Sequence, residues 1–117
     1  AELATALARR YHCVAAVTGP TDAVADGERV ILIEAGHPLL ARVTGTGCMA
    51  TGLVAACAAV EPDPLLASAA GLLRFGVAGA RAARQAAGPG SLRIGLCDAL
   101  AACDAAALRE EGRARWG

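Results

Sequence analysis

The sequence predicts an α/β fold with an incomplete sheet: a central strand, an edge hairpin and several helices. Three observations support this prediction. One continuous apolar run bounded by a turn signal is typical of a strand buried on both faces. Two further apolar runs flank Asp26-Gly27, which indicates a hairpin, and the second half of the chain has apolar residues at helical spacing. A chain of 117 residues suits one domain or part of a larger one.

The first half of the chain contains the predicted strands. Residues 2–11 predict a short helix, because apolar side chains recur one turn apart and two arginines follow near its negative end. Residues 13–18 predict the central strand of a parallel sheet. Residues 23–25 and 30–34 predict two antiparallel edge strands. Gly36-His37-Pro38 then predicts an extended loop, because proline disfavours helical geometry in the residue before it.

The second half predicts helices. Residues 49–60 and 64–87 each carry an apolar stripe interrupted by many small residues, which favours close packing against a neighbour. Ser91 is expected to cap a further helix, although the apolar spacing after it also allows a strand. Asp104 is expected to cap a last helix that frays into an arginine-rich tail at 109–117.

Composition excludes several classes of protein. With 56% hydrophobic and 19% charged residues the chain is too apolar to be disordered, and no apolar run reaches the roughly 18 residues of a membrane helix. Eleven basic residues balance eleven acidic ones, so nucleic acid and anionic membranes are not expected partners. Lysine is absent, which excludes the lysine-containing phosphate loop. Five cysteines and two histidines form no zinc-like spacing, and the odd cysteine count suits reduced, cytosolic thiols.

The segment Thr44-Gly45-Thr46-Gly47-Cys48 is the strongest candidate site. It directly precedes a predicted helix, where unpaired backbone N–H groups and the helix dipole favour an anion. Glycine at 45 and 47 allows positive φ and lets a phosphate approach the backbone. We expect the same field to favour the thiolate of Cys48, making it a candidate proton acceptor. The residues alone favour the plainer alternative, a tight helix cap with an inert, buried cysteine.

Other polar residues have plainer interpretations. The residues alone favour a His37 side chain that is hydrogen-bonded to the backbone. They favour an Asx-turn over magnesium binding at Asp22, and a turn-closing role for Thr18. Asp98 is expected on a helix surface. Four cysteines are expected in the core: Cys13, Cys57, Cys97 and Cys103. Three arginines are expected on a solvated helix face: Arg74, Arg81 and Arg84.

From Leu7 to about Ala101 the sequence also resembles the C-terminal half of the hydroxyethylthiazole kinase family. The likeness is strongest over Val17-Thr18-Gly19, Asp22, 26–30, 36–39 and Val43 to Cys48, and it extends through 88–91 and 96–100. The resemblance implies a ribokinase-like α/β fold, with residues 1–117 forming the C-terminal portion of a single kinase domain. It also implies phosphorylation of the alcohol 4-methyl-5-(2-hydroxyethyl)thiazole by ATP with magnesium, in cytoplasmic thiamine salvage.

The resemblance implies a role for each residue of the loop. Cys48 would act as the base near the substrate hydroxyl, where most ribokinase-like proteins have aspartate, and Gly45 would lie against the thiazole alcohol. Thr18 would contact ATP. Gly45, Thr46 and Gly47, with the N–H of Cys48, would stabilise the transferred phosphoryl group. Since phosphoryl transfer depends on positioning and charge neutralisation more than on proton abstraction, replacing Cys48 by aspartate is expected to keep activity.

The sequence departs from the family pattern at two positions. Pro20 stands where an acidic residue is common, and Ala23 where an aromatic residue is usual. The resemblance implies a longer chain, so the magnesium ligands and other contacts are expected outside residues 1–117. It also implies a homotrimer with sites between subunits. Two alternatives stay open: another ribokinase-like small-molecule kinase, such as a hydroxymethylpyrimidine kinase, and a catalytically inert segment that binds only a phosphate-bearing ligand or a partner subunit.

Overall fold

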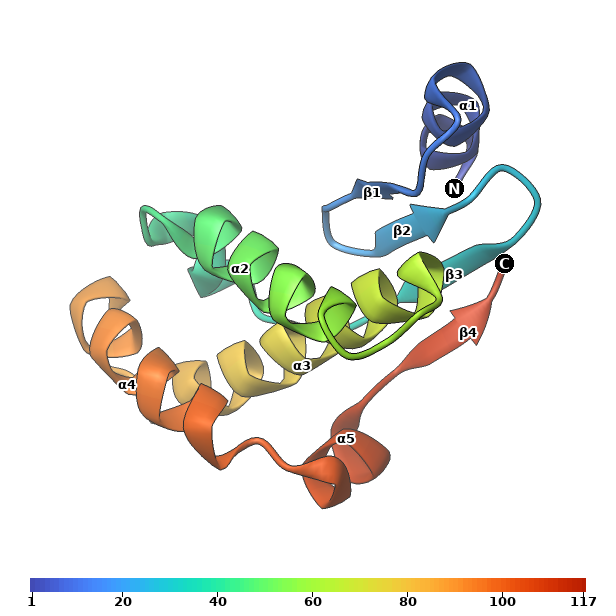
Figure 1. The fold of residues 1–117 in the computed structure, drawn as a ribbon. Helices are drawn as coiled ribbons and strands as arrows, with labels where there is room; N and C mark the ends of the chain where they lie inside the picture. Colours follow the sequence, from blue (N-terminus) through green and yellow to red (C-terminus); the bar gives the residue numbers. More distant parts are fainter.

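The chain forms a helix and three short strands, then four further α-helices, and ends in a fourth strand (Figure 1). The computed structural model describes every residue from 1 to 117. The helices are α1 (Glu2–Tyr11), α2 (Thr46–Ala58), α3 (Pro64–Gln85), α4 (Pro89–Ala102) and α5 (Ala105–Glu111), with a 3₁₀-helix, η1 (Pro38–Arg42), before α2. The strands are β1 (Ala15–Val17), β2 (Asp22–Ala25), β3 (Val30–Ile33) and β4 (Ala114–Trp116).

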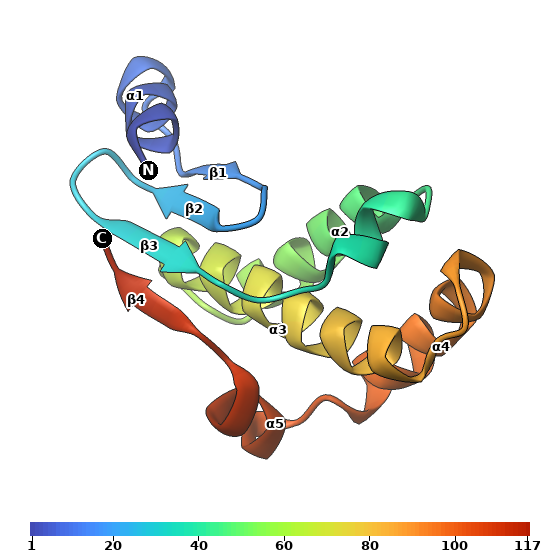
Figure 2. The same ribbon diagram turned by 180° about the vertical axis from the view of Figure 1, so that it is seen from behind.

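The four strands form one antiparallel sheet in the order β1-β2-β3-β4. Side chains alternate between its two faces, as the pleat requires. Val24, Ile31 and Ile33 belong to the cluster packed against α3. Ala23 and Ala25 belong to a second cluster, with the buried alanines of α1. Helices therefore cover both faces, α1 on one side and α3 on the other (Figures 1 and 2).

The strand predicted at 13–18 forms as β1, but it is not the central strand of a parallel sheet. It lies at the sheet edge, pairs antiparallel with β2, and Ala16 is exposed. The strand buried on both faces is β2, in which Ala23, Val24 and Ala25 are all buried. The predicted hairpin is confirmed, but its strands lie inside this sheet, not at its edge. A continuous apolar run indicates that both faces of a strand are buried, but it does not show which strand pairs with it.

The hairpin turn is held by the carboxylate of Asp26. Its Oδ1 accepts the N–H groups of Glu28 and Arg29 at 3.0 and 2.7 Å, and Gly27 adopts a φ of 99°, which favours glycine. The guanidinium of Arg29 pairs with Asp26 at 2.7 Å and also with Asp63, the N-cap residue of α3, at 2.8 Å. This ion-pair chain connects the hairpin to the start of α3.

Replacing Asp26 with asparagine should remove part of the pH dependence of stability. The backbone N–H groups of Arg29 and Glu28 lower the pKa of Asp26 to about 2, from an ordinary 3.8. A carboxyl group whose folded pKa is depressed stabilises the fold above its unfolded pKa, and this stabilisation is lost as the pH falls from 3.8 toward about 2. Urea midpoints of the wild type and Asp26→Asn should therefore differ at about pH 6 and converge at about pH 2. A difference that stays constant with pH would contradict this role.

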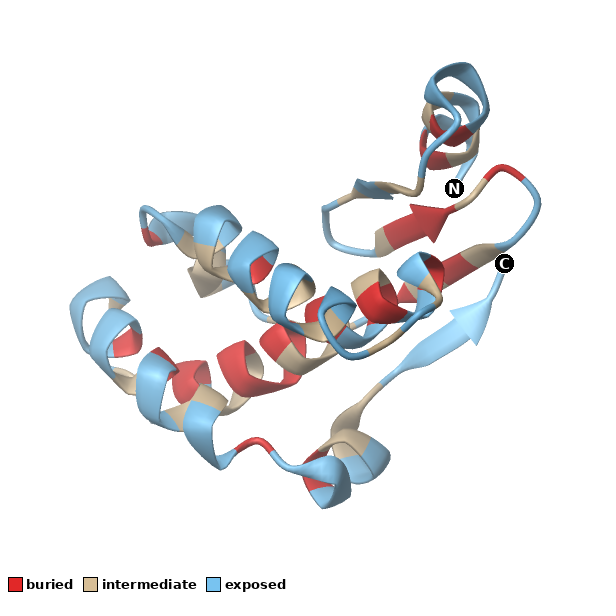
Figure 3. Cartoon of the chain, in the orientation of Figure 1, coloured by how far each residue is buried: buried red, intermediate tan, exposed pale blue.

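Helix α3 is the core of the helical layer, with α2 and α4 on either side of it (Figure 1), and buried residues run along most of its length (Figure 3). Small residues allow close approach: a Cβ on Gly71 would lie 2.7 Å from the Cα of Val54 in α2. The helix is long and apolar enough to span a membrane, but 61% of its most apolar stretch is buried inside the molecule, as in a core helix. The predicted packing of 64–87 on a neighbouring helix is thus confirmed.

The predicted solvated face of α3 is confirmed for Arg84, which is exposed, but not for Arg74 and Arg81, which are partly buried. Arg74 is partly buried and donates to the carbonyl of Leu100 near the end of α4, at 3.2 Å. Arg81 and Arg84 pair with Glu111 of α5 at 2.7 and 2.9 Å. Both guanidiniums, that of Arg81 first, lower the pKa of the Glu111 carboxyl. The helical period identified the polar side of α3 but not the later segment that folds back onto it.

The cysteine prediction is also wrong for three of the four residues. Cys13 and Cys97 are exposed and Cys57 is partly buried. Only Cys103 is buried, beneath α3, and burial raises the pKa of its thiol. Small apolar residues are abundant in this chain, so the general tendency of cysteine to be buried does not decide which cysteines are buried. Tertiary contacts decide it.

The C-terminal third is helical where the spacing allowed either element, and α4 starts before Ser91. The Oγ of Ser91 accepts the N–H of Gly88, the N-cap residue, so it supports the helix from the third position. Asp104 is confirmed as the N-cap of α5. The tail at 109–117 does not simply fray: α5 reaches Glu111, and β4 then pairs with β3. A three-residue strand has too little pattern to be predicted from sequence.

Candidate functional site

The start of α2 is built by Gly45. This residue is the N-cap, with a φ of 93° and ψ of −3°, and Thr46 is the first helical residue. The helix therefore begins three residues earlier than the predicted 49, and the glycine-rich segment forms its first turn. The backbone N–H groups of Thr46, Gly47 and Cys48 have no partner in the structure, while Met49 donates to the carbonyl of Gly45 at 3.0 Å. Three unpaired donors thus lie together at the positive end of a helix dipole.

Two threonine hydroxyls stabilise this turn. The Oγ1 of Thr46 lies 3.3 and 3.2 Å from the carbonyl oxygens of Leu40 and Val43, so it fastens the helix start to the preceding 3₁₀-helix. The Oγ1 of Thr51 donates to the carbonyl of Gly47 at 2.9 Å. Because both hydroxyls bond to backbone carbonyls, the first-turn amides stay available for a ligand.

A cleft of about 790 Å³ lies against this helix start. It is bordered by the end of β1, the start of β2, the end of β3 and the middle of α3. Antiparallel pairing explains the arrangement: Val17 pairs with Ala23 and Asp22 with Ile33, so the β1–β2 turn and the end of β3 reach the same end of the sheet. Polar residues of this cleft are Thr18, Asp22, Glu34, His37 and Thr46.

The structure brings most of the predicted site residues together. Thr18, Thr46 and Gly47 line the cleft, whereas Gly45 and Cys48 lie at the same helix start without lining it. Cys48 is exposed, so the burial expected in the plainer alternative is wrong. Gly45 has the expected positive φ; Gly47 does not. A Cβ on either glycine would meet no atom within 4 Å, so both positions face open space.

The polar side chains of the cleft are partly satisfied by backbone. The Nδ1 of His37 accepts the N–H of Leu39 at 3.1 Å, which confirms the backbone-bonded histidine. The Oδ1 of Asp22 accepts the N–H of Gly19 at 2.9 Å, three residues upstream, so the predicted Asx-turn, which bonds downstream, is wrong. Burial raises the pKa of the Asp22 carboxyl, and the bond from Gly19 opposes this shift.

Sequence reasoning missed the apolar wall of the cleft. Phe75, Gly76 and Leu72 from α3 line it together with Ala35 and Gly36. Gly36 has a φ of 112°, and a Cβ on Gly76 would lie 2.6 Å from the Cβ of Ala35, so the loop after β3 presses directly on α3. Gly36 and Gly76 are far apart in the sequence, and no sequence pattern indicates that the segments containing them come into contact. The single phenylalanine of the chain was the one available hint.

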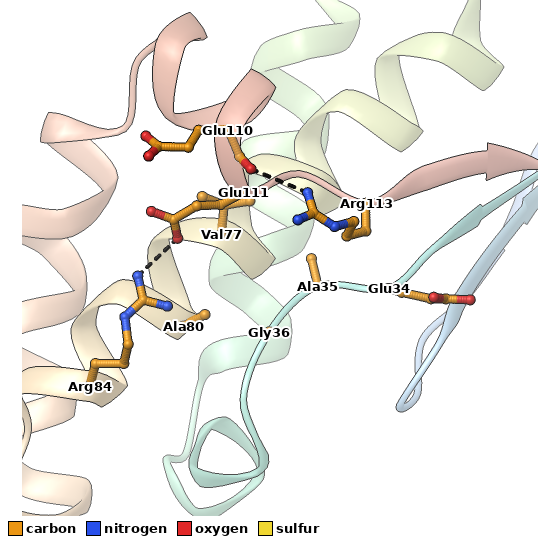
Figure 4. Close-up of a pocket in the computed structure, with 9 residues that line it drawn as sticks. All are labelled: Glu34, Ala35, Gly36, Val77, Ala80, Arg84, Glu110, Glu111 and Arg113. Atoms are coloured by element: carbon orange, nitrogen blue, oxygen red, sulfur yellow. Dashed lines mark hydrogen bonds and ion pairs between the residues drawn. The ribbon is translucent and has the colours of Figure 1, made fainter.

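A second, smaller cleft of about 420 Å³ lies between α3, α5 and the loop after β3 (Figure 4). It shares Glu34, Ala35 and Gly36 with the first cleft. Its two arginines already have partners: Arg84 forms an ion pair with Glu111 at 2.9 Å, and Arg113 donates to the backbone carbonyl of Glu110 at 3.2 Å. The larger cleft, which is lined by Thr46 and Gly47 with their unpaired amides, is therefore the better candidate for an anion.

The chain has a ribokinase-like α/β fold, in which a glycine-initiated helix opens onto a cleft at the ends of the strands. The sequence matches the Hydroxyethylthiazole kinase family over residues 1–106. The chain belongs to this family. The class and the family both agree with the resemblance seen in the sequence.

Individual relatives agree with this placement. The chain is 56% identical over 115 residues to a hydroxyethylthiazole kinase of Granulibacter bethesdensis, covering 98% of this chain and 41% of that relative. It is 50% identical over 113 residues to one of Nitratidesulfovibrio vulgaris, covering 97% and 42%. A solved hydroxyethylthiazole kinase from Pyrococcus horikoshii superposes with a TM-score of 0.96 at 39% identity, covering 99% of this chain and 45% of that one. The chain thus spans less than half the length of these relatives.

Proposed function

We propose that this chain is the phosphoryl-transfer segment of an ATP-dependent hydroxyethylthiazole kinase. The observation that carries the proposal is the group of three unpaired amides at Thr46, Gly47 and Cys48, next to a cleft that Thr18 also lines. Backbone N–H groups at a helix start are suited to negatively charged phosphoryl oxygens. The named relatives supply the substrate class, a thiazole bearing a primary alcohol.

Each residue has a distinct role in this proposal. ATP supplies the γ-phosphoryl group, and the three amides stabilise charge on it during in-line transfer. Gly45, which has open space where a side chain would stand, lets the thiazole alcohol approach the backbone. Thr18, which directly follows β1 and lines the same cleft, contacts ATP. Cys48 accepts the proton of the alcohol, a modest contribution because the transition state is largely dissociative.

The fit to the two cofactors differs. The open helix start fits the phosphates of ATP, since its donors are unpaired and no side chain covers its glycines. No group of three or more His, Cys, Asp or Glu side chains in the chain is arranged to hold a metal ion. We place the magnesium ligands outside these residues, within a single kinase domain of which 1–117 is the C-terminal portion. We further propose a trimeric, cytoplasmic enzyme of thiamine salvage that binds neither nucleic acid nor membranes.

The proposal is tested by ADP release from the natural polypeptide that contains these residues. ADP formation should require both ATP and the thiazole alcohol, and should fall away when the alcohol is replaced by its deoxy analogue. A panel containing hydroxymethylpyrimidine distinguishes a related kinase. Absence of thiazole-dependent ADP release from folded protein that still binds ATP would refute the assigned substrate.

Replacement of Cys48 separates its role as base from that of its backbone N–H. Cys48→Asp should retain or raise kcat, because a carboxylate replaces the thiol as proton acceptor. Cys48→Ala should lower kcat by on the order of 10²-fold with little change in the KM for ATP. Cys97→Ala, at an exposed helical cysteine outside the cleft, is the matched control and should behave as wild type. Equal activity of all three variants would remove Cys48 from the mechanism.

A further inference from the structure

Asp22, the first residue of β2, forms a side-chain hydrogen bond that strand pairing does not require. Its Oδ1 accepts the N–H of Gly19 at 2.9 Å, across the turn that joins β1 to β2. No backbone–backbone hydrogen bond closes the residues of this turn, 18–21. The carboxylate of Asp22 is therefore the group that fixes the path of the chain immediately after Thr18.

The surroundings of Asp22 connect this turn to the candidate site. Asp22 and Thr18 line the same cleft as Thr46 and Gly47. Asp22 is partly buried, and burial raises the pKa of its carboxyl, so placing a charge there is unfavourable unless the charge forms a useful contact. The hydroxyl of Thr18 forms no intramolecular hydrogen bond and is free for a ligand. Nothing else holds Thr18 at this wall apart from its neighbouring strand.

We propose that Asp22 is a positioning residue for the nucleotide: by accepting the N–H of Gly19 it holds Thr18 where Thr18 contacts ATP. The inference rests on the proposed function for the identity of the ligand. It assigns the carboxylate no direct contact with substrate or metal. A charged acceptor is suited to this task because hydrogen bonds to ionised groups are roughly twice as strong as those between neutral groups.

Two substitutions in the natural polypeptide separate positioning from direct binding. Asp22→Asn keeps an oxygen that accepts the N–H of Gly19 but replaces the charged hydrogen bond by a weaker neutral one, so ATP affinity should fall by clearly less than in Asp22→Ala. Asp22→Ala removes the acceptor, so ATP binding by calorimetry should weaken roughly tenfold, which corresponds to the loss of one charged hydrogen bond. The KM for the thiazole alcohol should change in neither variant.

A double-mutant cycle with Thr18→Ala adds a readout that a purely structural role would not produce. If Asp22 acts through Thr18, Asp22→Ala should have little further effect on ATP affinity once Thr18 is alanine. Asp22→Ser, whose hydroxyl is too short to reach the turn, replaces the alanine variant if the latter does not fold. Unfolding midpoints of all variants identify any loss that comes from general destabilisation.

Several results would overturn the inference. Equal loss of ATP affinity in Asp22→Asn and Asp22→Ala, with an altered magnesium requirement, would make Asp22 a direct contact. Wild-type ATP affinity in Asp22→Ala would remove it from nucleotide binding. These outcomes are separate from failure of the proposed function: a wild type that binds ATP without turning over the thiazole alcohol loses its assigned substrate, while the calorimetric comparison of the Asp22 variants still decides the positioning role.

Discussion

Replacing Gly76 with alanine should lower the free energy of unfolding by about 2 kcal/mol or more, and the melting temperature by roughly 8 °C. The added Cβ would lie 2.6 Å from the Cβ of Ala35 and 2.9 Å from its carbonyl carbon, far inside van der Waals contact. The obstacle is backbone and a β-carbon, so no flexible side chain can move away. The loop after β3, or α3 itself, must shift.

The matched control is Gly95→Ala in α4. This glycine is also helical, but a Cβ there meets no atom within 4 Å. Alanine at this position should stabilise the fold by about 0.5–1 kcal/mol, because glycine loses more conformational freedom on helix formation. Thermal and urea unfolding should show that Gly76→Ala lowers the free energy of unfolding and that Gly95→Ala raises it. Equal effects would show that the contact between α3 and Ala35 does not limit stability.

Gly47→Ala should leave the fold intact and lower kcat by on the order of 10²-fold, if the proposed phosphoryl-transfer role is correct. A Cβ at this position meets no atom within 4 Å, so the protein itself offers no steric resistance. The methyl group would instead occupy the open space in front of the first-turn amides, where the phosphoryl oxygens must approach. Stability should be equal or a few tenths of a kcal/mol higher, as expected for alanine in a helix.

The control for this loss of activity is Gly52→Ala, later in the same helix. Gly52 is also exposed, and a Cβ there would also meet no atom within 4 Å, but this residue does not line the cleft. Gly52→Ala, in the helix interior, should stabilise the fold by about 0.5–1 kcal/mol, as expected for Gly95→Ala, and should match the wild type in thiazole-dependent ADP release. Full activity of Gly47→Ala would show that the amides of this turn do not contact the transferred group.

Features set by adjacent residues were predictable from the sequence. Asp26-Gly27 specified the hairpin turn, because glycine accepts a positive φ and aspartate bonds the following amides. The helical period of 64–87 identified α3 and its buried side. The glycine-rich segment before α2 located the helix start with its unpaired backbone donors, although the helix begins at Thr46 instead of residue 49.

Features that depend on distant partners were not predictable. The burial of β2 on both faces needs α1 on one side and α3 on the other, and the pairing of β4 needs the free edge of β3. Arg81 is turned to Glu111 by the return of the chain after α4, which no local period describes. The same holds for the contact of Gly76 with Ala35 that forms the wall of the cleft.

The amino-acid order by itself therefore determined the types of the elements before α4, the hairpin turn and the donors at the start of α2, since each follows from the conformational preferences of neighbouring residues. The tertiary structure decided the strand order, the burial of each cysteine and arginine, and the meeting of Thr18 with Thr46 in one cleft. The physical reason is range. Backbone preferences act over a few residues, whereas burial and side-chain pairing depend on which segments pack together once the whole chain has folded.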